Sequence, residues 1–354
     1  MALVAVTFVW GATFVVVQEA VERLAVFPFN AWRFAIAATT LGVAVRGQLP
    51  HLGRRGLRRG VLLGTALWAG YALQTFGLTL TTAPKAAFIT GMVVVITPLL
   101  QAPILRQVPA GPAVTGAVMA AVGLGLLTLH GSLVPAAGDL LVLGCAVAFV
   151  LHLIGLGAWS SAHPVGALAT VQLATAALLH ATGGTVRDAA IGAASAWWTG
   201  SPYVWAAIGF TAVFATALAF FAQTAAQRVL SPTRTAVVFT LEPVFAWLTA
   251  WLGVPLLAAA GIRGLSAATF GAREAAGAAL ILVGMLWSEL RGGEAPDALA
   301  AEETAALGTA EGSGRSPAPN KGDGTRRRSL SEVPRVRRGR GRRRAPPSRS
   351  GPPR

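Results

Sequence analysis

The sequence predicts an all-α membrane protein of ten transmembrane helices, arranged as two inverted five-helix repeats and followed by a disordered C-terminal tail. Two observations lead to the helices and a third to the repeats. Of 354 residues, 54% are hydrophobic and 12% are charged, whereas soluble domains carry about 25% charged residues. Apolar stretches of spanning length recur along the chain, and in lipid each must be a helix because its backbone cannot be hydrated there. A spacing of polar residues also occurs twice.

The ten apolar stretches lie within the first 290 residues. They are residues 2–17, 28–45, 60–81, 86–105, 112–130, 139–158, 164–182, 203–227, 233–253 and 274–290. Pro28, Pro164, Pro202 and Pro232 stand at or just before predicted helix starts, where a missing N–H costs little. The first stretch is short for a span, which needs about 20 residues. Residues 254–272 are apolar but broken by Gly and Arg, which predicts an interfacial loop or a re-entrant segment.

Loop charges predict the orientation. The basic loop residues are Arg46, Arg54, Arg55, Arg58 and Arg59 between the second and third spans, and Arg228 and Arg234 between the eighth and ninth. The first loop instead carries Glu19, Glu22 and Arg23. The positive-inside rule places the Arg-rich loops in the cytoplasm, and an even number of spans then places both termini there. We therefore expect a multi-pass protein of the cell membrane with both termini cytoplasmic.

The last 64 residues differ from the apolar body in composition. Residues 1–290 have a net charge of +7 and residues 291–354 a net charge of +8, so the basic character is concentrated in this short tail. The tail is rich in Pro, Gly, Ser and Arg, which predicts disorder. Its basic runs favour contact with anionic lipids. No nucleic acid is expected as a partner, because no aromatic residues interleave the arginines as stacking surfaces.

The polar spacing that occurs twice predicts an internal duplication. Gln74, Thr75, Lys85 and Ala87 each recur 149 residues later as Gln223, Thr224, Arg234 and Ala236. Pro98 and Pro243 are also expected to break equivalent apolar helices, at a slightly different offset. The predicted repeats are residues 2–130 and 139–290, with residues 291–354 as the tail; chance similarity among Ala/Val/Leu-rich helices is the alternative.

An odd number of spans in each repeat inverts the second copy in the membrane. Inverted repeats are typical of secondary transporters, whose two halves exchange roles as a central site opens first to one side and then to the other. The duplication therefore moves the expectation from a membrane protein in general to a transporter.

Glu242 is the main candidate for chemistry. It lies near the middle of the ninth span, where a charge costs about 2.5–3.5 kcal/mol on insertion scales, so its side chain should face the bundle interior. Pro243 follows it and removes the N–H that would bond the carbonyl of Phe239. The pair predicts a broken helix with a carboxyl group beside a free carbonyl. A substrate contact or protonatable coupling site and a helix-locking hydrogen bond are both open.

Six further residues are candidates for cavity lining. Arg33, near the start of the second span, could pair with an anion or extend to the interface. Gln74 and Gln223 occupy equivalent places and could line a pseudo-symmetric cavity or join helices. His152 could take up a proton near neutral pH or remain a neutral, hydrogen-bonded helix residue. Trp10 and Thr13 could form a cavity wall or simply pack.

No cofactor or metal site is expected. Cys145 is the only cysteine, so no disulfide forms within one chain, and the five histidines lack metal-ligand spacing. The sequence contains no G-x-x-x-x-G-K-[ST], G-x-S-x-G or H-E-x-x-H motif. This argues against an ATP-driven pump and a standard hydrolase, so transport would use a gradient.

Several segments in order resemble the EamA family of the drug/metabolite transporter superfamily. They are Trp10-Gly11-Ala12-Thr13-Phe14, Pro28-Phe29, Arg33-Phe34, residues 83–100, residues 231–251 with Leu241-Glu242-Pro243, and residues 277–284. The resemblance implies ten helices, tandem repeats, cytoplasmic termini and a central cavity. It also implies export or exchange of small metabolites, amino acids or drugs. The chain departs from the family pattern at Arg106-Gln107, where an acid is common, and in residues 254–272.

The leading hypothesis is a secondary transporter of small molecules working by alternating access, and not an enzyme. A membrane-embedded enzyme acting on a lipid-linked substrate is an alternative, although the cytoplasmic loops offer few acids or histidines. A non-transporting sensor or scaffold with a partner-binding tail is another. The expected partners are a small-molecule substrate and the bilayer, and a homodimer remains to be tested.

Overall fold

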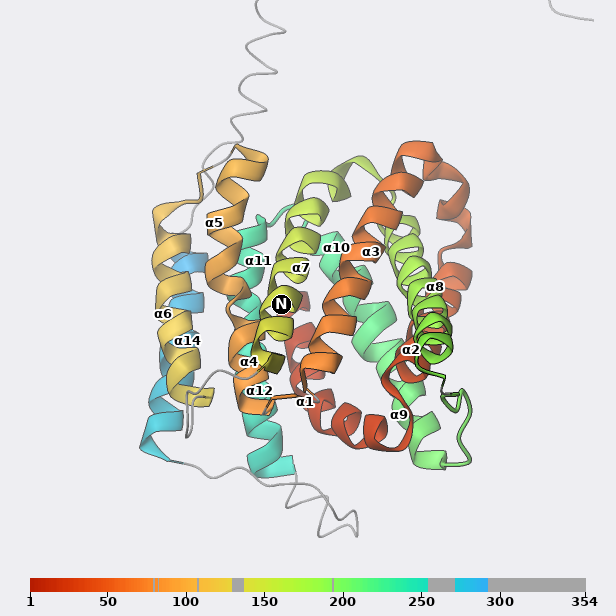
Figure 1. The fold of residues 1–354 in the computed structure, drawn as a ribbon. Helices are drawn as coiled ribbons and strands as arrows, with labels where there is room; N and C mark the ends of the chain where they lie inside the picture. The colour runs from red at the N-terminus through yellow and green to blue at the C-terminus, as the bar shows by residue number, and fades with distance from the viewer. Residues whose placement is uncertain are drawn as a thin grey trace, which may run out of the picture. The chain divides into compact units, whose positions relative to one another are not determined.

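The computed structural model describes residues 1–78, 80–81, 83–106, 108–128, 137–192, 194–253 and 271–291. These residues form helices and short connections, with no β-strand among them (Figure 1). The predictions of a disordered tail and of a loop or re-entrant segment at residues 254–272 concern residues that lie almost wholly outside these ranges. The side chain of Lys85, used in the predicted repeat, also lies outside the described part of the chain.

The helices follow the predicted apolar stretches in chain order. In the first half they are α1 (Ala2–Arg23), α2 (Val26–Ala44), η1 (Arg46–His51), α3 (Gly53–Leu78), α4 (Ala83–Gly91), α5 (Val93–Leu105) and α6 (Gly111–Thr128). In the second they are α7 (Ala137–Trp159), η2 (Ser160–Ala162), α8 (Val165–Ile191), α9 (Pro202–Ala212), η3 (Val213–Leu218), α10 (Ala219–Ala226), α11 (Pro232–Phe239), α12 (Leu241–Leu248), η4 (Thr249–Gly253) and α14 (Ala272–Arg291).

Four helical stretches within the described residues are long and apolar enough to cross a membrane. They are Phe88–Leu105, Ala137–Ala162, Val165–Ile191 and Pro202–Ala226. Ala2–Thr13 and Gly111–Leu126 are shorter apolar helices. The count of ten spans and their arrangement as two inverted repeats stay predictions.

Two helix boundaries correct the sequence-based prediction. Glu22 and Arg23 lie in the last turn of α1 and not in a loop, so the helix has 22 residues and continues past its apolar segment. Four arginines that we expected in the second loop, Arg54, Arg55, Arg58 and Arg59, lie in the first two turns of α3. In both places the helix continues past its apolar segment, because charged side chains at a helix end can extend into water while the backbone stays hydrogen-bonded.

Two helices are interrupted near the predicted prolines. The fourth apolar stretch breaks at Met92, between α4 and α5, and Pro98 lies inside α5. The expectation that Pro98 itself marks the break is therefore wrong. The ninth breaks at Thr240, between α11 and α12, three residues before Pro243. A proline lacks its own N–H and clashes with the carbonyl four residues earlier, so Pro243 disturbs the turn at Phe239 and Thr240. Met92 lies farther from Pro98 than that reach, and Pro98 does not explain the break there.

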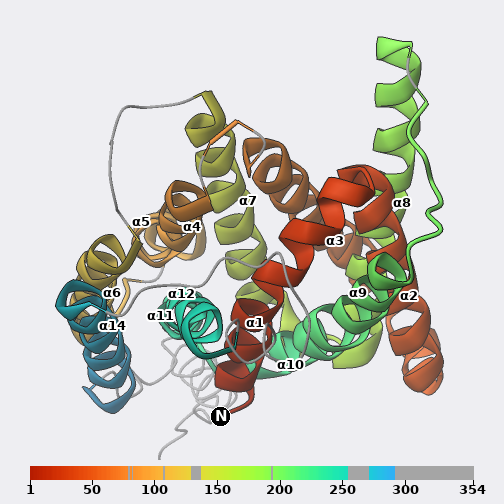
Figure 2. The same ribbon diagram turned by 90° about the horizontal axis from the view of Figure 1, so that it is seen from below.

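Glycines allow two pairs of helices to touch backbone to backbone. A Cβ on Gly116 of α6 would lie 2.5 Å from the carbonyl oxygen of Gly284 in α14, and a Cβ on Gly284 would lie 2.7 Å from the carbonyl oxygen of Gly116. α6 and α14 accordingly run side by side (Figures 1 and 2). A Cβ on Gly11 of α1 would lie 2.6 Å from the backbone nitrogen of Ala246 in α12. Such small residues are the usual means of close helix contact in membranes.

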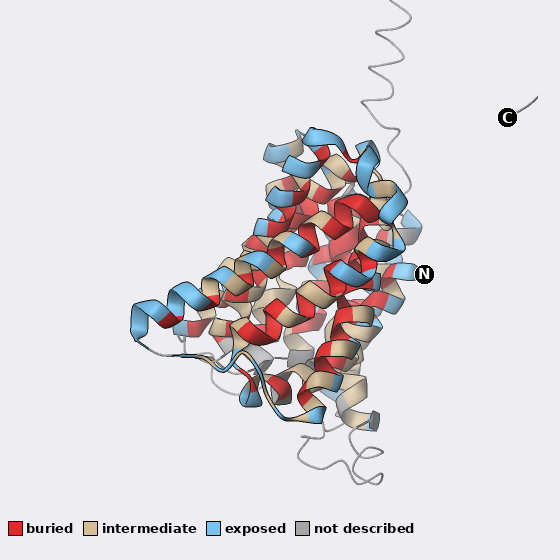
Figure 3. Ribbon diagram, turned by 90° about the vertical axis from the view of Figure 1, so that its right-hand side faces the viewer, coloured by how far each residue is buried: buried red, intermediate tan, exposed pale blue. Residues whose placement is uncertain are grey.

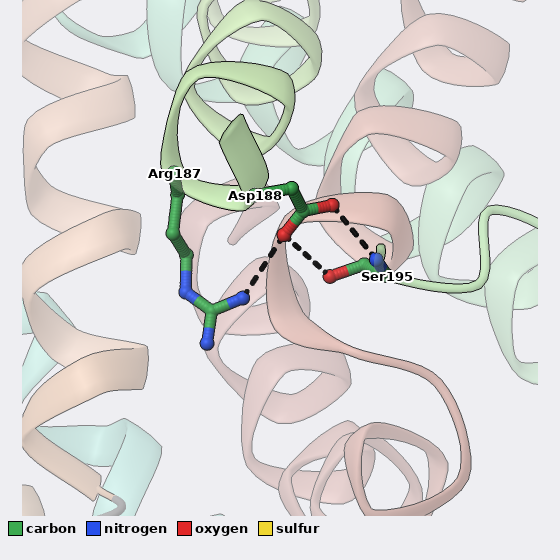
Figure 4. Close-up of polar contacts among 3 residues, drawn as sticks. All are labelled: Arg187, Asp188 and Ser195. Atoms are coloured by element: carbon green, nitrogen blue, oxygen red, sulfur yellow. Dashed lines mark hydrogen bonds and ion pairs between the residues drawn. The ribbon is translucent and has the colours of Figure 1, made fainter. Parts of the chain in front are cut away.

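The connection between α8 and α9 is tied to the end of α8. The Asp188 carboxylate accepts hydrogen bonds of 2.8 Å from both the backbone N–H and the hydroxyl of Ser195 (Figure 4). Arg187 also reaches this carboxylate, at 3.1 Å. Trp32 of α2 donates its indole N–H to the carbonyl oxygen of Trp197 over 2.8 Å. The connection is thereby fixed to both α8 and α2.

Buried and exposed residues alternate along the helices, so that each helix has a buried face and a more exposed one (Figure 3). One cluster joins both halves of the chain, because Phe34 and Leu67 pack with Leu173 and Phe220. Exposed leucines and valines such as Leu62, Val118 and Leu178 stand on outer faces, as expected of helices that contact lipid.

Candidate functional site

A cavity of about 770 Å³ lies between the two halves of the chain. Eight of the nine residues selected from the sequence line it: Trp10, Thr13, Arg33, Gln74, His152, Gln223, Glu242 and Pro243. The exception is Pro98, which borders a separate small apolar pocket with Val95 and Leu99. Polar residues from both halves of the chain, from Thr13 to Glu242, are thus brought to one chamber, although their roles stay predictions.

The cavity reaches one end of the helix bundle. Its lining includes Glu22 in the last turn of α1, Val26 at the first position of α2, and Thr81 in the connection between α3 and α4. These three residues belong to helix ends that the predicted topology places on the same, non-cytoplasmic side. Near the opposite end of the bundle, Gln227 donates its side-chain amide to the carbonyl oxygen of Leu153 over 2.9 Å.

Arg33 is buried and does not extend to the interface, which corrects one of the two readings left open by the sequence. Its side chain is 5% exposed. The guanidinium Nε donates to the hydroxyl of Thr216 over 2.7 Å, and the guanidinium carbon lies 5.2 Å from the centre of the Tyr71 ring. Nη2 of Arg33 also donates to the carbonyl oxygen of Ala215, at 3.5 Å. A hydroxyl, a carbonyl oxygen and an aromatic face thus hold the plane of the guanidinium beside the cavity.

Thr216 belongs to η3, a π-helical turn inserted between α9 and α10. The carbonyl oxygen of Ala215 in this turn accepts a hydrogen bond of 2.7 Å from the indole Nε1 of Trp10. π-helical turns inside longer helices are rare and occur often at functional sites. Here the turn receives the side chains of Trp10 and Arg33, both from the first half of the chain.

Glu242 lies in the first turn of α12, directly after the break at Thr240. Its carboxylate has no hydrogen bond or ion pair with any described residue, so the helix-locking hydrogen bond considered from the sequence is not formed. Arg33 and Glu242 line the same cavity without forming an ion pair. The chamber therefore offers a guanidinium and a carboxyl group, not paired with each other, to a bound molecule.

The two glutamines from equivalent positions differ in their contacts. Gln74 donates its amide to the hydroxyl of Thr90 over 3.3 Å. Gln223 donates its amide to Gln227 over 3.2 Å, and its Oε1 is buried without a hydrogen-bond partner. A buried carbonyl oxygen without a donor is costly, so Gln223 has an unfilled acceptor at the cavity wall.

His152 is hydrogen-bonded within the helix bundle. Its Nε2 lies 2.6 Å from Oε1 of Gln172 in α8, and its ring meets the Phe220 ring edge-on at 5.9 Å between centres. It also lines the cavity. Among the described residues, no group of three or more His, Cys, Asp and Glu side chains could hold a metal ion.

Sequence reasoning missed several residues of the site. Phe220 and Phe239 surround Trp10, with ring centres 5.8 Å and 5.1 Å from it, and both line the cavity. Tyr71 and Thr216 hold Arg33. No local signal distinguishes these aromatic residues and threonines from the many others in apolar helices, because their role arises from tertiary contacts.

Comparison with known proteins finds a family match for the first part of the chain. Residues 1–129 match the model of the EamA-like transporter family. This segment is similar to that family. The resemblance seen in the sequence is thereby confirmed, and together with the apolar helices it makes the chain a multi-pass membrane protein. The EamA segment contains α1 to α6 and supplies Trp10, Thr13, Arg33 and Gln74 to the cavity.

One curated relative and one solved structure are also similar to the chain. An uncharacterized transporter of Archaeoglobus fulgidus is 35% identical over 149 residues, which are 42% of this chain and 46% of the relative. The chain thus spans about half the length of this curated relative. One crystal structure of a protein superimposes with a TM-score of 0.63 at 22% identity, covering 82% of this chain and 98% of the other. At this identity the likeness shows a shared fold alone.

Proposed function

We propose that the chain is a secondary transporter of the cell membrane that exports or exchanges small organic molecules by alternating access between two inverted five-helix repeats. Small metabolites, amino acids and drugs are the substrate classes to test. The observation that carries the proposal is the cavity of about 770 Å³, a size typical of small-molecule sites. Each predicted repeat supplies part of its wall.

The chemistry of the lining supports transport of a polar or charged molecule. Arg33 comes from the first predicted repeat and Glu242 from the second, and neither is neutralised by an ion pair with the other. Buried charges of this kind are expensive in a membrane and usually mark a substrate or ion pathway. Glu242 is the residue that we propose for substrate contact or proton coupling.

The shape of the cavity supports a state open to one side. It reaches the helix ends at Glu22, Val26 and Thr81, which the positive-inside rule places outside the cell. In the alternate state the inverted second repeat would adopt the role of the first, and the cavity would open to the cytoplasm. Both termini and the basic tail are proposed to lie on that cytoplasmic side, with the tail on anionic lipids.

Flux through proteoliposomes tests the function. The purified full-length chain would be screened for uptake of radiolabelled amino acids, other metabolites and cationic drugs, with and without an imposed pH gradient. We expect saturable uptake of at least one class. In the same vesicles Glu242→Gln should lower uptake about tenfold or more, the usual effect of losing a charge-assisted contact. Asp188→Asn serves as the control, because it alters an acid that lies outside the cavity.

Two results would count against the proposal. Absence of saturable uptake across the screen would remove the transport function, and wild-type uptake by Glu242→Gln would remove the role of this carboxylate. Deleting residues 292–354 separates a transporter from a scaffold: uptake should survive the deletion, while binding to vesicles containing phosphatidylglycerol should weaken.

A further inference from the structure

Two hydrogen-bond relays connect α7 with α10 behind the cavity wall. The first runs from His152 of α7 through Gln172 of α8 to Thr224 of α10. The second runs from Gln223 of α10 through Gln227 to the backbone of Leu153 in α7. Each relay begins at a residue that lines the cavity, His152 or Gln223. The relay from Gln223 ends on the backbone of Leu153, which also lines the cavity. The direction in which hydrogens are donated along each relay can be deduced from its last acceptor.

The relay from Gln223 ends on a backbone carbonyl. The oxygen of Leu153 can only accept, so the Gln227 side chain must direct its Nε2 toward it, at 2.9 Å. The Oε1 of Gln227 is then the acceptor for Nε2 of Gln223, at 3.2 Å. The Gln223 amide is thereby fixed in one orientation, and the oxygen that remains is the buried, unpartnered Oε1.

The relay from His152 ends in the same way. The Thr224 hydroxyl donates to the carbonyl oxygen of Phe220 over 2.7 Å, so it can only accept from Nε2 of Gln172, at 3.2 Å. Oε1 of Gln172 therefore faces Nε2 of His152 as an acceptor, at 2.6 Å. Nε2 must carry the hydrogen, and in the neutral imidazole Nδ1 is left with a lone pair. Nδ1 makes no hydrogen bond with a described residue.

Both relays thus leave an unpaired acceptor on a residue that lines the cavity. Flipping either terminal amide would set two oxygens against each other, so the protein fixes this polarity. His152 and Gln223 are joined through Phe220, which meets the His152 ring and precedes Gln223 by one turn on α10. Trp10 and Phe239 extend the aromatic wall from Phe220. An aromatic wall beside fixed acceptors suits a cation that carries N–H groups.

We propose that His152 Nδ1 and Gln223 Oε1 form a subsite for the N–H-bearing cationic end of the substrate, a protonated primary amine. This inference rests on the proposed function for its biological meaning, but binding tests it without transport. Gln227 and Thr224 are positioning residues, because they act only through the acceptors that they orient. The subsite should bind a primary ammonium more tightly than a quaternary ammonium. A quaternary ammonium can contact the aromatic wall, but it has no N–H group to donate to either acceptor.

Equilibrium dialysis of the full-length purified protein with labelled benzylamine and labelled benzyltrimethylammonium measures this selectivity at neutral pH. The two probes share the charge and the ring and differ in N–H groups. Wild-type protein should bind benzylamine about tenfold or more tightly than its trimethylated analogue, as expected when a polar site loses its hydrogen-bonding partner. Gln223→Leu should reduce that ratio toward one.

Gln227→Met is the sharper variant, because it changes no residue of the cavity wall. It frees Gln223 to present either end of its amide, so the binding ratio should fall by several-fold while benzyltrimethylammonium binds as in the wild type. Gln101→Leu is the matched control. It removes a buried glutamine that accepts from Thr233 over 2.7 Å outside the cavity, and it should keep the wild-type ratio.

Three outcomes would overturn the subsite: equal binding of the two probes to wild type, an unchanged ratio in Gln223→Leu, or no binding of either probe at millimolar concentration. Selective binding without flux in proteoliposomes would retain the subsite and remove the transport function. Flux in proteoliposomes without selective binding of benzylamine would retain the transport function and remove the subsite.

Discussion

The indole of Trp10 donates a hydrogen bond of 2.7 Å to the carbonyl oxygen of Ala215, 205 positions away in the chain. The bond joins α1, in the EamA segment, to the π-helical turn η3 in the second half. Arg33 reaches the adjacent residue of the same turn, Thr216. This irregular turn is therefore the point at which two polar side chains of the first half are held by the second.

Removing the donor from Trp10 should loosen that contact. Trp10→Phe keeps a ring between Phe220 and Phe239 but leaves the Ala215 carbonyl without its indole partner. We expect a loss of about 0.5–1.5 kcal/mol in stability, measured as a lower thermal unfolding midpoint in detergent. Trp205→Phe, which removes a similar bond to Thr199 at the α8–α9 connection, provides the comparison. If only Trp205→Phe lowered the midpoint, the Trp10 contact would not be stabilising.

Arg33→Lys should retain the charge and lose the geometry. A lysine is a point charge that cannot reproduce the planar fork held by Thr216 and Tyr71. We expect normal membrane insertion with uptake reduced about tenfold, read in the vesicle assay described above. Arg187→Lys is the matched control, because Arg187 forms a partly exposed ion pair with Asp188 and such pairs contribute little. Equal uptake by Arg33→Lys and wild type would show that charge alone suffices.

Gly11→Ala should separate α1 from α12. The added Cβ would lie 2.6 Å from the backbone nitrogen of Ala246 and 2.7 Å from the carbonyl oxygen of Glu242, and backbone atoms cannot move aside as flexible side chains can. We expect destabilisation by about 1–3 kcal/mol. Gly209→Ala, where no atom lies within 4 Å, should instead stabilise the helix by up to about 1 kcal/mol. Similar unfolding midpoints for the two variants would contradict the close contact at Gly11.

A pH-dependent contribution is expected at His163, which follows η2. Nη1 of Arg59 donates to its Nε2 over 3.0 Å, and because arginine cannot accept, the imidazole must be neutral. Partial burial and the Arg59 charge lower the pKa of His163. Its pKa in the unfolded chain is about 6.5, so the unfolded state binds more protons. The contribution is therefore present above about pH 6.5 and is lost as pH falls through the lowered folded pKa.

His163→Gln tests that expectation, because an amide oxygen accepts from Arg59 at every pH. Thermal unfolding midpoints measured from pH 7.5 to 5 should fall less steeply in this variant than in the wild type. His51→Gln controls for a histidine that lies outside this contact. Parallel curves for wild type and His163→Gln would mean that His163 does not contribute to the pH dependence.

A minority of the residues that line the cavity could be predicted from the sequence, chiefly because a polar residue in an apolar helix stands out. Glu242 and Arg33 are predicted on that ground and Gln223 on its equivalence to Gln74, and all three line one chamber. The supporting residues could not be chosen. Gln172 and Gln227 acquire their roles only through the neighbours that accept their hydrogens, and nothing local in residues 213–218 predicts a π-helical turn.

The helix breaks show a similar limit. Proline marks a disturbed helix but not the residue at which hydrogen bonding fails. The break near Pro243 occurs at Thr240, and the break at Met92 is not explained by Pro98. The ends of α1 and α3 differ from the predicted ends for another reason. Composition locates the apolar part of a helix, whereas α1 and α3 extend beyond it in charged turns.

The paired glycines of α6 and α14 have a consequence for movement. These two helices close the first and second predicted repeats, and each presents a glycine to the other's backbone, Gly116 to Gly284 and Gly284 to Gly116. A contact of this reciprocal form is unchanged when its two sides are interchanged. If the repeats exchange conformations as proposed, the contact between α6 and α14 does not have to repack. The helices around the cavity can then rotate about this contact as a fixed axis.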